Sequence, residues 1–340
     1  AAIKYFLLGS FAAAIFLFGS ALLYGATGHT GLVAMGRAIA AGSPHLGLVV
    51  LGMALLLSSF AFKVSAVPFH MWAPDAYEGA PTPVTTFMAV AVKSAAFASL
   101  VRVLWGTFSD DLSLSPDTGW PALLAGLSAI TMLYGNVAAV SQSSVKRMLA
   151  YSSIAHAGYI LVAVVASFRV PDLGLSSAFF YLMAYTVSNV LAFGALILAG
   201  SKGKEVVSYE DLAGLGRRHP ALALPFVIGV LSLMGFPPTV GFFAKYYVFS
   251  AAVSAGGGMV YLAILGVLTS AVGAYYYLRV IVFLFMREPK AGAPIADPMR
   301  SGYVVVAVTL AGAMVMLLGL FPSSLLEMAT AAASSLATAP

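Results

Sequence analysis

Four basic side chains lie inside long apolar segments of this sequence: Lys63, Lys93, His156 and Lys245. At about 1.5 Å of rise per helical residue, the last three lie roughly 14–16 Å from one end of their segments, too far for the charge to extend fully into water. A charged residue at the centre of a bilayer costs at least about 2.5–3.5 kcal/mol on insertion scales. A functional role is the economical explanation for such a cost.

Burial suits a lysine to proton transfer, because it lowers the pKa of the ammonium into a range where a proton is taken up and released. Movement of a nearby carboxylate or of water would then switch its proton affinity. The alternative is a lysine held statically by a carboxylate or by backbone carbonyls, which explains one lysine better than it explains three. His156 has two readings that stay open: a proton relay through its two ring nitrogens, or core packing.

Three further polar residues follow the first interruption of the apolar pattern. His70 is a candidate relay, although its neighbour Trp72 makes a packing role equally reasonable. Asp75 and Glu78 are candidates for a proton entrance, with a polar helix end in water as the alternative.

Other polar and aromatic residues are assigned to the membrane boundary. Arg102 and Arg279 lie within about two turns of their helix ends, so their side chains can extend to the headgroups. The run Tyr275-Tyr276-Tyr277 is typical of aromatic residues at a membrane interface.

The composition requires a membrane setting for these residues. Of the 340 residues, 61% are hydrophobic and only 9% are charged, whereas soluble domains carry roughly a quarter charged residues. The formal net charge of +5 is scattered through loops without a basic face, which argues against nucleic-acid binding. The absence of cysteine excludes disulfides and thiolate-held iron–sulfur clusters, and the five histidines form no haem-attachment or H-x-x-x-H motif. We therefore expect no bound metal or redox cofactor.

Apolar windows between breakers predict an all-α polytopic membrane protein with nine spans. The spans lie near residues 4–25, 46–66, 83–106, 119–139, 145–166, 175–199, 221–254, 258–286 and 301–320. Val67-Pro68-Phe69-His70 ends the second span ahead of a short amphipathic stretch, 69–79, and Gly235-Phe236-Pro237-Pro238 breaks the seventh. Free backbone groups are tolerated in hydrocarbon only inside protein or beside a watery cavity. Two breaks, each near a membrane lysine, favour a transport path over ordinary kinks.

Loop charges predict the orientation of the chain, because cytoplasmic loops carry an excess of Lys and Arg. One side has only Arg37 and Arg169, and the other has Lys4, Lys146, Arg147, Lys202, Lys204, Arg217, Arg218, Arg287, Lys290 and Arg300. The chain is therefore expected to start in the cytoplasm and to end outside. The polar segment 206–219 is expected to be an interfacial helix or a plain loop. Since Ala1-Ala2-Ile3-Lys4 leads directly into a full-length helix pattern, the sequence is expected to begin inside a longer protein.

Three motifs resemble the antiporter-like membrane subunits of respiratory complex I. They are FKVSAVPFHMWAPDAYEGAPTPV at residues 62–84, VKRMLAYSSIAH at 145–156 and GFPPTVGFFAK at 235–245. The wording PDAYEGAPTPV is typical of the N-type subunits of that family. The resemblance spans the whole chain, and its first motif is long and specific.

The resemblance implies a fold of fourteen helices with two inverted five-helix repeats, of which this chain is similar to helices six to fourteen. Residues 1–106 then hold helices six to eight of the first repeat, 107–286 the second repeat, and 287–340 a loop and the C-terminal helix. By the same resemblance Lys63, Lys93 and Lys245 are the lysines of helices seven, eight and twelve, and His156 is a relay position in helix ten. The family's glutamate on helix five has no counterpart in this sequence.

The function implied is proton translocation as a subunit of NADH:quinone oxidoreductase in the bacterial inner membrane. Such a subunit belongs to a translocating enzyme but carries no redox site, and its partners are other membrane subunits, including further antiporter-like ones. Two alternatives remain: a subunit of a cation/proton antiporter or membrane hydrogenase, and a scaffold whose lysines are locked in fixed pairs.

Overall fold

The computed structural model of the chain describes residues 1–42, 45–115, 119–200, 205–289 and 301–337. Four cations used for the orientation lie outside these ranges: Lys202, Lys204, Lys290 and Arg300. Within the described ranges the regular elements are helices, and one isolated bridge joins Ser144 to Ser208.

Eight helical stretches of the described chain are long and apolar enough to cross a membrane. They are α1 (Ala2–Thr27), α3 (Leu46–Val64), the stretch Thr82–Thr107, α7 (Trp120–Val140), α8 (Val145–Ala166), α9 (Pro171–Ala199), α13 (Gly258–Met286) and α14 (Gly302–Leu320). Two shorter helices, α11 (Pro220–Met234) and α12 (Val240–Ala255), lie on either side of the second predicted break and together occupy the seventh predicted span, 221–254. The all-α polytopic architecture is confirmed.

The stretch Thr82–Thr107 is not a uniform α-helix. It consists of α5 (Thr82–Phe87), a π-helical turn η1 (Met88–Val92) and α6 (Lys93–Thr107). A π turn inserts an extra residue and rotates the side chains that follow it. Lys93 is the first residue after this turn.

Short helices account for the main differences from the sequence-based expectation. The helices α2 (Leu32–Ala40) and α15 (Pro322–Ala337) were not predicted. The prediction of one interfacial helix over 206–219 is wrong: the segment forms two separate turns, η2 (Glu210–Leu212) and α10 (Leu215–Arg218). Gly214, with φ of 69°, separates them, and Leu212 and Leu215 are buried rather than interfacial.

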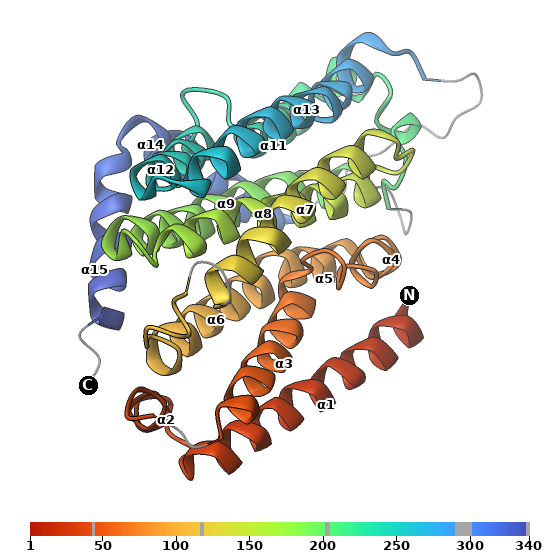
Figure 1. Ribbon diagram of the computed structural model, residues 1–340. Coiled ribbons are helices and arrows are strands. Elements are labelled where there is room, and N and C mark those ends of the chain that lie inside the picture. Colours follow the sequence, from red (N-terminus) through yellow and green to blue (C-terminus); the bar gives the residue numbers. More distant parts are fainter. Residues whose placement is uncertain (43–44, 116–118, 201–204, 290–300, 338–340) are drawn as a thin grey trace.

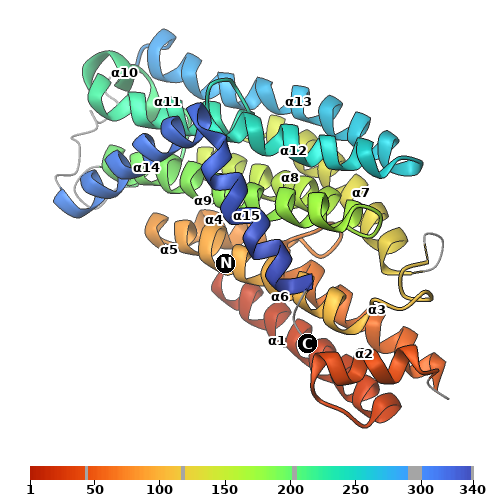
Figure 2. The same ribbon diagram turned by 90° about the vertical axis from the view of Figure 1, so that its left-hand side faces the viewer.

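The spans are stacked in layers (Figure 1). The helices α1 and α3 lie side by side at one edge, α11, α12 and α13 lie at the opposite edge, and α7, α8 and α9 lie between them. The view in Figure 2 shows the same order and places α15 across the outside of the bundle, in contact with α9 and α14. The middle layer is therefore enclosed by protein on both sides.

Helix α8 is the centre of the bundle. Every residue of this 22-residue helix except Arg147 is buried. Small residues allow α7 and α8 to pack closely. A Cβ at Gly158 of α8 would lie 2.6 Å from the side chain of Met132 on α7. A Cβ at Gly135 of α7 would lie 2.7 Å from the backbone nitrogen of Ala155 on α8. Membrane helices commonly approach through small residues in this way.

The first predicted break is present between α3 and α4 (Ala73–Gly79). Helix α3 ends at Val64, and Ser65 takes a left-handed conformation with φ of 63°. Neighbouring elements satisfy the free backbone groups: Val67 donates its N–H to Thr131 Oγ1 of α7 at 2.9 Å, and Trp72 Nε1 donates to the Phe62 carbonyl at 2.9 Å. Ser65, Ala66 and Val67 of the break are buried in protein, as a hydrocarbon environment requires of free backbone groups.

The second break is present between α11 and α12. Helix α11 ends at Met234, Gly235 has φ of 87°, and α12 begins at Val240. Helix α14 packs tightly on this break, since a Cβ at Gly319 would lie 2.0 Å from the Pro238 carbonyl oxygen. Both interruptions predicted from glycine and proline placement are confirmed.

The packing of α7 on α8 predicts a stability difference between two glycines of α7. Replacing Gly135 with valine should destabilise the fold by about 1–3 kcal/mol, because the added carbons meet the backbone of α8. Gly126 is a matched control, since a Cβ there would meet no atom within 4 Å. Thermal unfolding of the purified protein measures both variants. Equal melting temperatures for Gly135→Val and Gly126→Val would contradict the packing argument.

Candidate functional site

Lys93 reaches α8 from α6. The residue is 2% exposed, and its Nζ donates to the Ser153 carbonyl oxygen at 2.7 Å and to Ser153 Oγ at 2.5 Å. The hydroxyl of Tyr185 on α9 donates to the same Oγ at 2.9 Å. Within the described ranges no carboxylate oxygen lies within ion-pair distance of Lys93. Its charge is therefore balanced by hydroxyl and carbonyl dipoles, not by an anion.

His156 lies one turn further along α8 and meets two tyrosines. Its Nδ1 is 2.7 Å from Tyr181 Oη on α9, and its Nε2 is 3.0 Å from Tyr277 Oη on α13. The hydroxyl of Tyr277 also meets Ser152 Oγ on α8. Both ring nitrogens are engaged by hydroxyl groups, each of which can donate or accept a proton. The ring of His156 is therefore hydrogen-bonded at both nitrogens as well as buried.

Lys245 joins α12 to the break that precedes it. Its Nζ donates to the Met234 carbonyl at 2.8 Å and to Ser270 Oγ of α13 at 2.6 Å. Met234 is the last residue of α11, where helical carbonyls have no partner within the helix and carry the negative end of the helix dipole. The break therefore creates the acceptor that holds the lysine.

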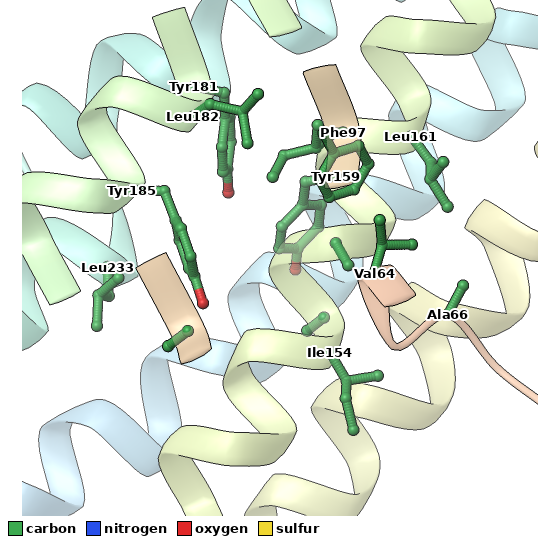
Figure 3. Packing of buried hydrophobic residues seen from close by; sticks show 14 of the residues in the cluster. Val64, Ala66, Phe97, Ile154, Tyr159, Leu161, Tyr181, Leu182, Tyr185 and Leu233 are labelled. Carbon is green, nitrogen blue, oxygen red and sulfur yellow. The ribbon is translucent and has the colours of Figure 1, made fainter. Parts of the chain in front are cut away.

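A further polar group contains Asn136 and two tyrosines. Asn136 of α7 donates to Tyr159 Oη at 2.9 Å and accepts from Tyr276 Oη at 3.0 Å. The Nζ of Lys245 lies 5.2 Å from the centre of the Tyr159 ring. Figure 3 shows Tyr159, Tyr181 and Tyr185 among apolar side chains such as Phe97, Leu161 and Leu233. The buried tyrosines around α8 are called the tyrosine array, and they are Tyr159, Tyr181, Tyr185, Tyr276 and Tyr277.

The array contains contacts that are not hydrogen bonds. The ring centroids of His156 and Tyr185 are 5.1 Å apart, whereas both ring nitrogens of His156 are hydrogen-bonded to other tyrosines. A small cavity of about 10 Å³ borders His156, Tyr185, Ser188 and Ser232. This volume is close to the smallest that accepts one water. A continuous chain of hydrogen bonds from His156 to Tyr185 would therefore need hydroxyl rotation or an added water at this contact.

Two residues of the array were assigned wrongly from the sequence. The run Tyr275-Tyr276-Tyr277 was expected at the interface, but only Tyr275 is exposed, at 59%, whereas Tyr276 and Tyr277 are each 1% exposed. Successive residues of a helix point about 100° apart, so three in a row cannot all face lipid. The three consecutive tyrosines in a helical segment were therefore the sequence signal that at least one of them faces the interior.

Lys63 and His70 lie apart from this group. Lys63 is half-buried on the last turn of α3, and within the described chain no hydrogen bond or ion pair engages its ammonium. His70 is buried with its ring 4.6 Å from that of Tyr134, and its Nδ1 has no hydrogen-bond partner among the described residues. The structure thus brings three of the four predicted basic residues together around α8 and leaves Lys63 beside the first break.

The predicted entrance carboxylates are held in ion pairs. Asp75 meets Lys4 Nζ at 2.5 Å and Arg147 Nη1 at 2.9 Å, and Glu78 meets Arg147 Nη1 at 3.1 Å. The hydrogen bond from Lys4 holds the pKa of the Asp75 carboxyl below its usual range. Both carboxylate side chains are 32% exposed, and their ion pairs fasten α4 to the start of α8.

Lys146 was assigned to a cytoplasmic loop, but its side chain is only 1% exposed. Its Nζ donates to the Ala80 carbonyl at 2.7 Å and to Glu205 at 2.7 Å. The Glu205 carboxylate also accepts from the backbone N–H and the hydroxyl of Thr82, each at 2.9 Å. Partial burial opposes ionisation of Glu205, but the hydrogen bonds from Lys146 and Thr82 outweigh it and lower the pKa of this carboxyl. We call Lys146, Glu205 and Thr82 the Glu205 clamp.

No group of three His, Cys, Asp or Glu side chains in the described ranges is close enough to hold a metal ion. The fold and the site define a class of protein: a helical membrane bundle with two interrupted spans and buried lysines held by dipoles. The sequence profile of the "NADH:quinone oxidoreductase/Mrp antiporter, TM" family matches residues 1–273. The chain belongs to this family.

Two curated relatives carry related names. The chain is 58% identical over 336 residues to "NADH-quinone oxidoreductase subunit N 1" of Sorangium cellulosum, covering 98% of this chain and 66% of the relative. It is 43% identical to the protein of the same name from Solibacter usitatus, covering 99% and 67%. The chain thus spans about two thirds of the length of the curated relatives it matches.

Solved structures agree on the fold. A chain of respiratory complex I from Thermus thermophilus superposes with a TM-score of 0.79 at 40% identity, covering 96% of this chain and 68% of that one. A chain of the Mrp complex from Dietzia superposes with a TM-score of 0.85, covering 98% and 67%. Since the second is only 24% identical, it supports the shared fold alone.

The Glu205 clamp predicts an acid-sensitive contact. Because the pKa of Glu205 is lowered by its partners, the contact is fully present above the ordinary glutamate value of 4.5 and is lost as the pH falls through the lowered value. The variant Glu205→Ala should reproduce the loss at neutral pH and speed hydrogen exchange of the Thr82 amide by about tenfold, the equivalent of one hydrogen bond to a charged group.

Glu327→Ala is the control for this experiment, because Glu327 is an exposed carboxylate on α15 that is remote from the clamp. Hydrogen–deuterium exchange read at the peptide containing Thr82 is the measurement. Unchanged exchange in Glu205→Ala would show that the clamp does not hold the start of α5.

Proposed function

We propose that this chain translocates protons as an N-type antiporter-like subunit of a membrane-bound NADH:quinone oxidoreductase. The names of its relatives supply the class of enzyme. The observation that carries the proposal is the arrangement of Lys93, His156 and Lys245 around α8, each held by hydroxyl or carbonyl groups. In this proposal the chain is part of a translocating enzyme but holds no redox cofactor itself.

The absence of fixed counter-ions supports proton transfer over a static scaffold. A scaffold lysine in the membrane would be expected to pair with a carboxylate, because an uncompensated buried charge is costly. Lys93 and Lys245 instead contact neutral groups that tolerate either the ammonium or the amine. Within the described ranges, the carboxylates that form ion pairs are Asp75, Glu78 and Glu205, all near the start of α8.

The direction of transfer is proposed from the charges of the loops. Arg217 and Arg218 lie at the end of the bundle assigned to the cytoplasm, and Arg37 and Arg169 at the end assigned to the outside. Protons enter near Lys63, His70, Asp75 and Glu78, pass Lys93 and His156, and leave near Lys245. Entry requires that the ion pairs of Asp75 and Glu78 open or that water bypasses them.

The chain is divided into repeats as part of the same proposal. Residues 1–106 hold the remainder of one inverted repeat, 107–286 hold the second, and 287–340 hold a connection and the last helix. The presence of one broken span in each of the first two units supports this division. The partners are other membrane subunits of the complex, including further antiporter-like ones, in the bacterial inner membrane.

The proposal predicts that Lys245 must be able to lose its proton. Lys245→Met removes the titrating group and keeps its bulk, whereas Lys245→Arg keeps a charge that effectively cannot deprotonate. Both variants should reduce the proton transfer carried by this subunit by at least about tenfold, in line with the loss of a general acid–base group. NADH-driven proton pumping by the assembled complex in vesicles is the measurement.

Arg217→Met is the control, because it removes one exposed positive charge away from the array. It should pump normally. Normal pumping in Lys245→Arg would overturn the release role of Lys245. Normal pumping after combined neutral replacement of Lys63, Lys93 and Lys245 would favour the scaffold alternative.

The orientation is tested by cysteine labelling, which the chain permits because it has no native cysteine. Thr30→Cys, in the connection before α2, should react with a membrane-impermeant maleimide added to intact spheroplasts. Arg217→Cys should react only after permeabilisation. The reverse pattern would invert the proposed direction of transport.

A further inference from the structure

Helices α2, α6 and α15 enclose a cleft at one end of the bundle, remote from the tyrosine array. Its volume is about 770 Å³, and its lining includes Arg37, Arg102, Trp105 and Leu336. Figure 2 shows the last turns of α15 near α6 and α2. Neither α2 nor α15 takes part in the proposed proton path.

Two glycines bring the arginines of this cleft together. A Cβ at Gly36 of α2 would lie 2.7 Å from the Gly106 carbonyl oxygen of α6, so the two helices touch through backbone. Arg37 follows the first glycine directly, and Arg102 precedes the second by one turn. The hydroxyl of Thr107 donates to the Leu32 carbonyl at 3.3 Å and fixes the same crossing. The close approach of α2 and α6 therefore places two guanidinium groups on one cleft.

Both guanidinium groups are without a partner in the described part of the chain. Arg37 and Arg102 are exposed, and no described carboxylate lies within 4.0 Å of either. Asp110, close to the end of α6, turns its carboxylate to the amides of Leu112 and Ser113 instead. By contrast, Arg147, Arg169 and Arg279 all have acceptors within the protein. The cleft thus presents two cations that the described chain does not neutralise.

We propose that this cleft binds the phosphate of an anionic phospholipid headgroup. Guanidinium groups bind phosphate in a bidentate manner, and basic pockets between membrane helices are suited to lipid headgroups. The other walls are apolar, formed by Leu32, Val33 and Leu336, and they give an acyl chain a surface that a free phosphate ion does not need. The volume also exceeds the space that a single inorganic anion fills. The occupant is therefore a lipid rather than a dissolved ion.

The test uses the intact protein in its complex, purified and exchanged into lipid nanodiscs containing equal amounts of phosphatidylglycerol and phosphatidylcholine. Lipid that stays bound after mild delipidation is quantified by mass spectrometry. Wild type should retain phosphatidylglycerol in preference to phosphatidylcholine. Each arginine near a membrane surface contributes roughly a fivefold preference at low salt, so Arg37→Gln with Arg102→Gln should lower the ratio by roughly 25-fold.

Two further variants make the result specific. Arg217→Gln removes the same exposed charge at another place and should retain the wild-type ratio. Gly36→Leu keeps both arginines but forces α2 away from α6, so the preference should fall without any change of charge.

Three outcomes would overturn the proposal. The first is a wild-type ratio with no preference for the anionic lipid. The second is a preference that survives in the double arginine variant. The third is displacement of the lipid by millimolar inorganic phosphate, which would reassign the cleft to a free anion.

Discussion

The structure depends on one constraint: inside a membrane, backbone groups and fully buried charges need partners within the protein. A helix that ends in the hydrocarbon layer leaves carbonyls without partners, and a buried lysine lacks water to solvate it. At the second break the lysine and the helix end satisfy each other, because Lys245 donates to the carbonyl of Met234, the last residue of α11. At the first break, groups from α7 and the Trp72 indole satisfy the backbone instead, and Lys63 stays beside the helix end.

The same constraint explains why α8 is the axis of the candidate path. Its small residues allow α7, α9 and α12 to approach closely, which excludes lipid from Ser152, Ser153 and His156. The polar groups in this enclosed space are hydroxyls, an amide and carbonyls, which can exchange donor and acceptor roles or solvate either protonation state. The hydrogen bonds fall into separate groups around Ser153, His156 and Asn136. The ring contact of His156 with Tyr185 separates the first two groups, so the connection between them depends on motion or water.

Among the described residues, the ion pairs lie at the end of the bundle at which α8 begins. Lys4, Asp75, Glu78 and Arg147 fasten α4, and Lys146 with Glu205 fastens the start of α5. This separation has a physical basis, since a carboxylate next to Lys93 or Lys245 would stabilise the ammonium and hold its proton. The family match covers residues 1–273, which includes both broken spans and the lysines and histidines of the proposed path, but not Tyr276 and Tyr277.

The sequence alone determined the membrane class, the nine apolar spans and both helix breaks, because these follow from local composition and from the backbone limits of proline and glycine. It also singled out Lys93, His156 and Lys245, because a basic residue within an apolar segment can be recognised from the local sequence without knowledge of its contacts. Only the tertiary structure decided what surrounds them. Tyr276 and Tyr277 are interior because helix rotation is set by packing on α7 and α8, and Lys146 is buried because Glu205, 59 residues away, reaches it. Contacts between distant segments leave no local pattern, and they decide which polar residues meet.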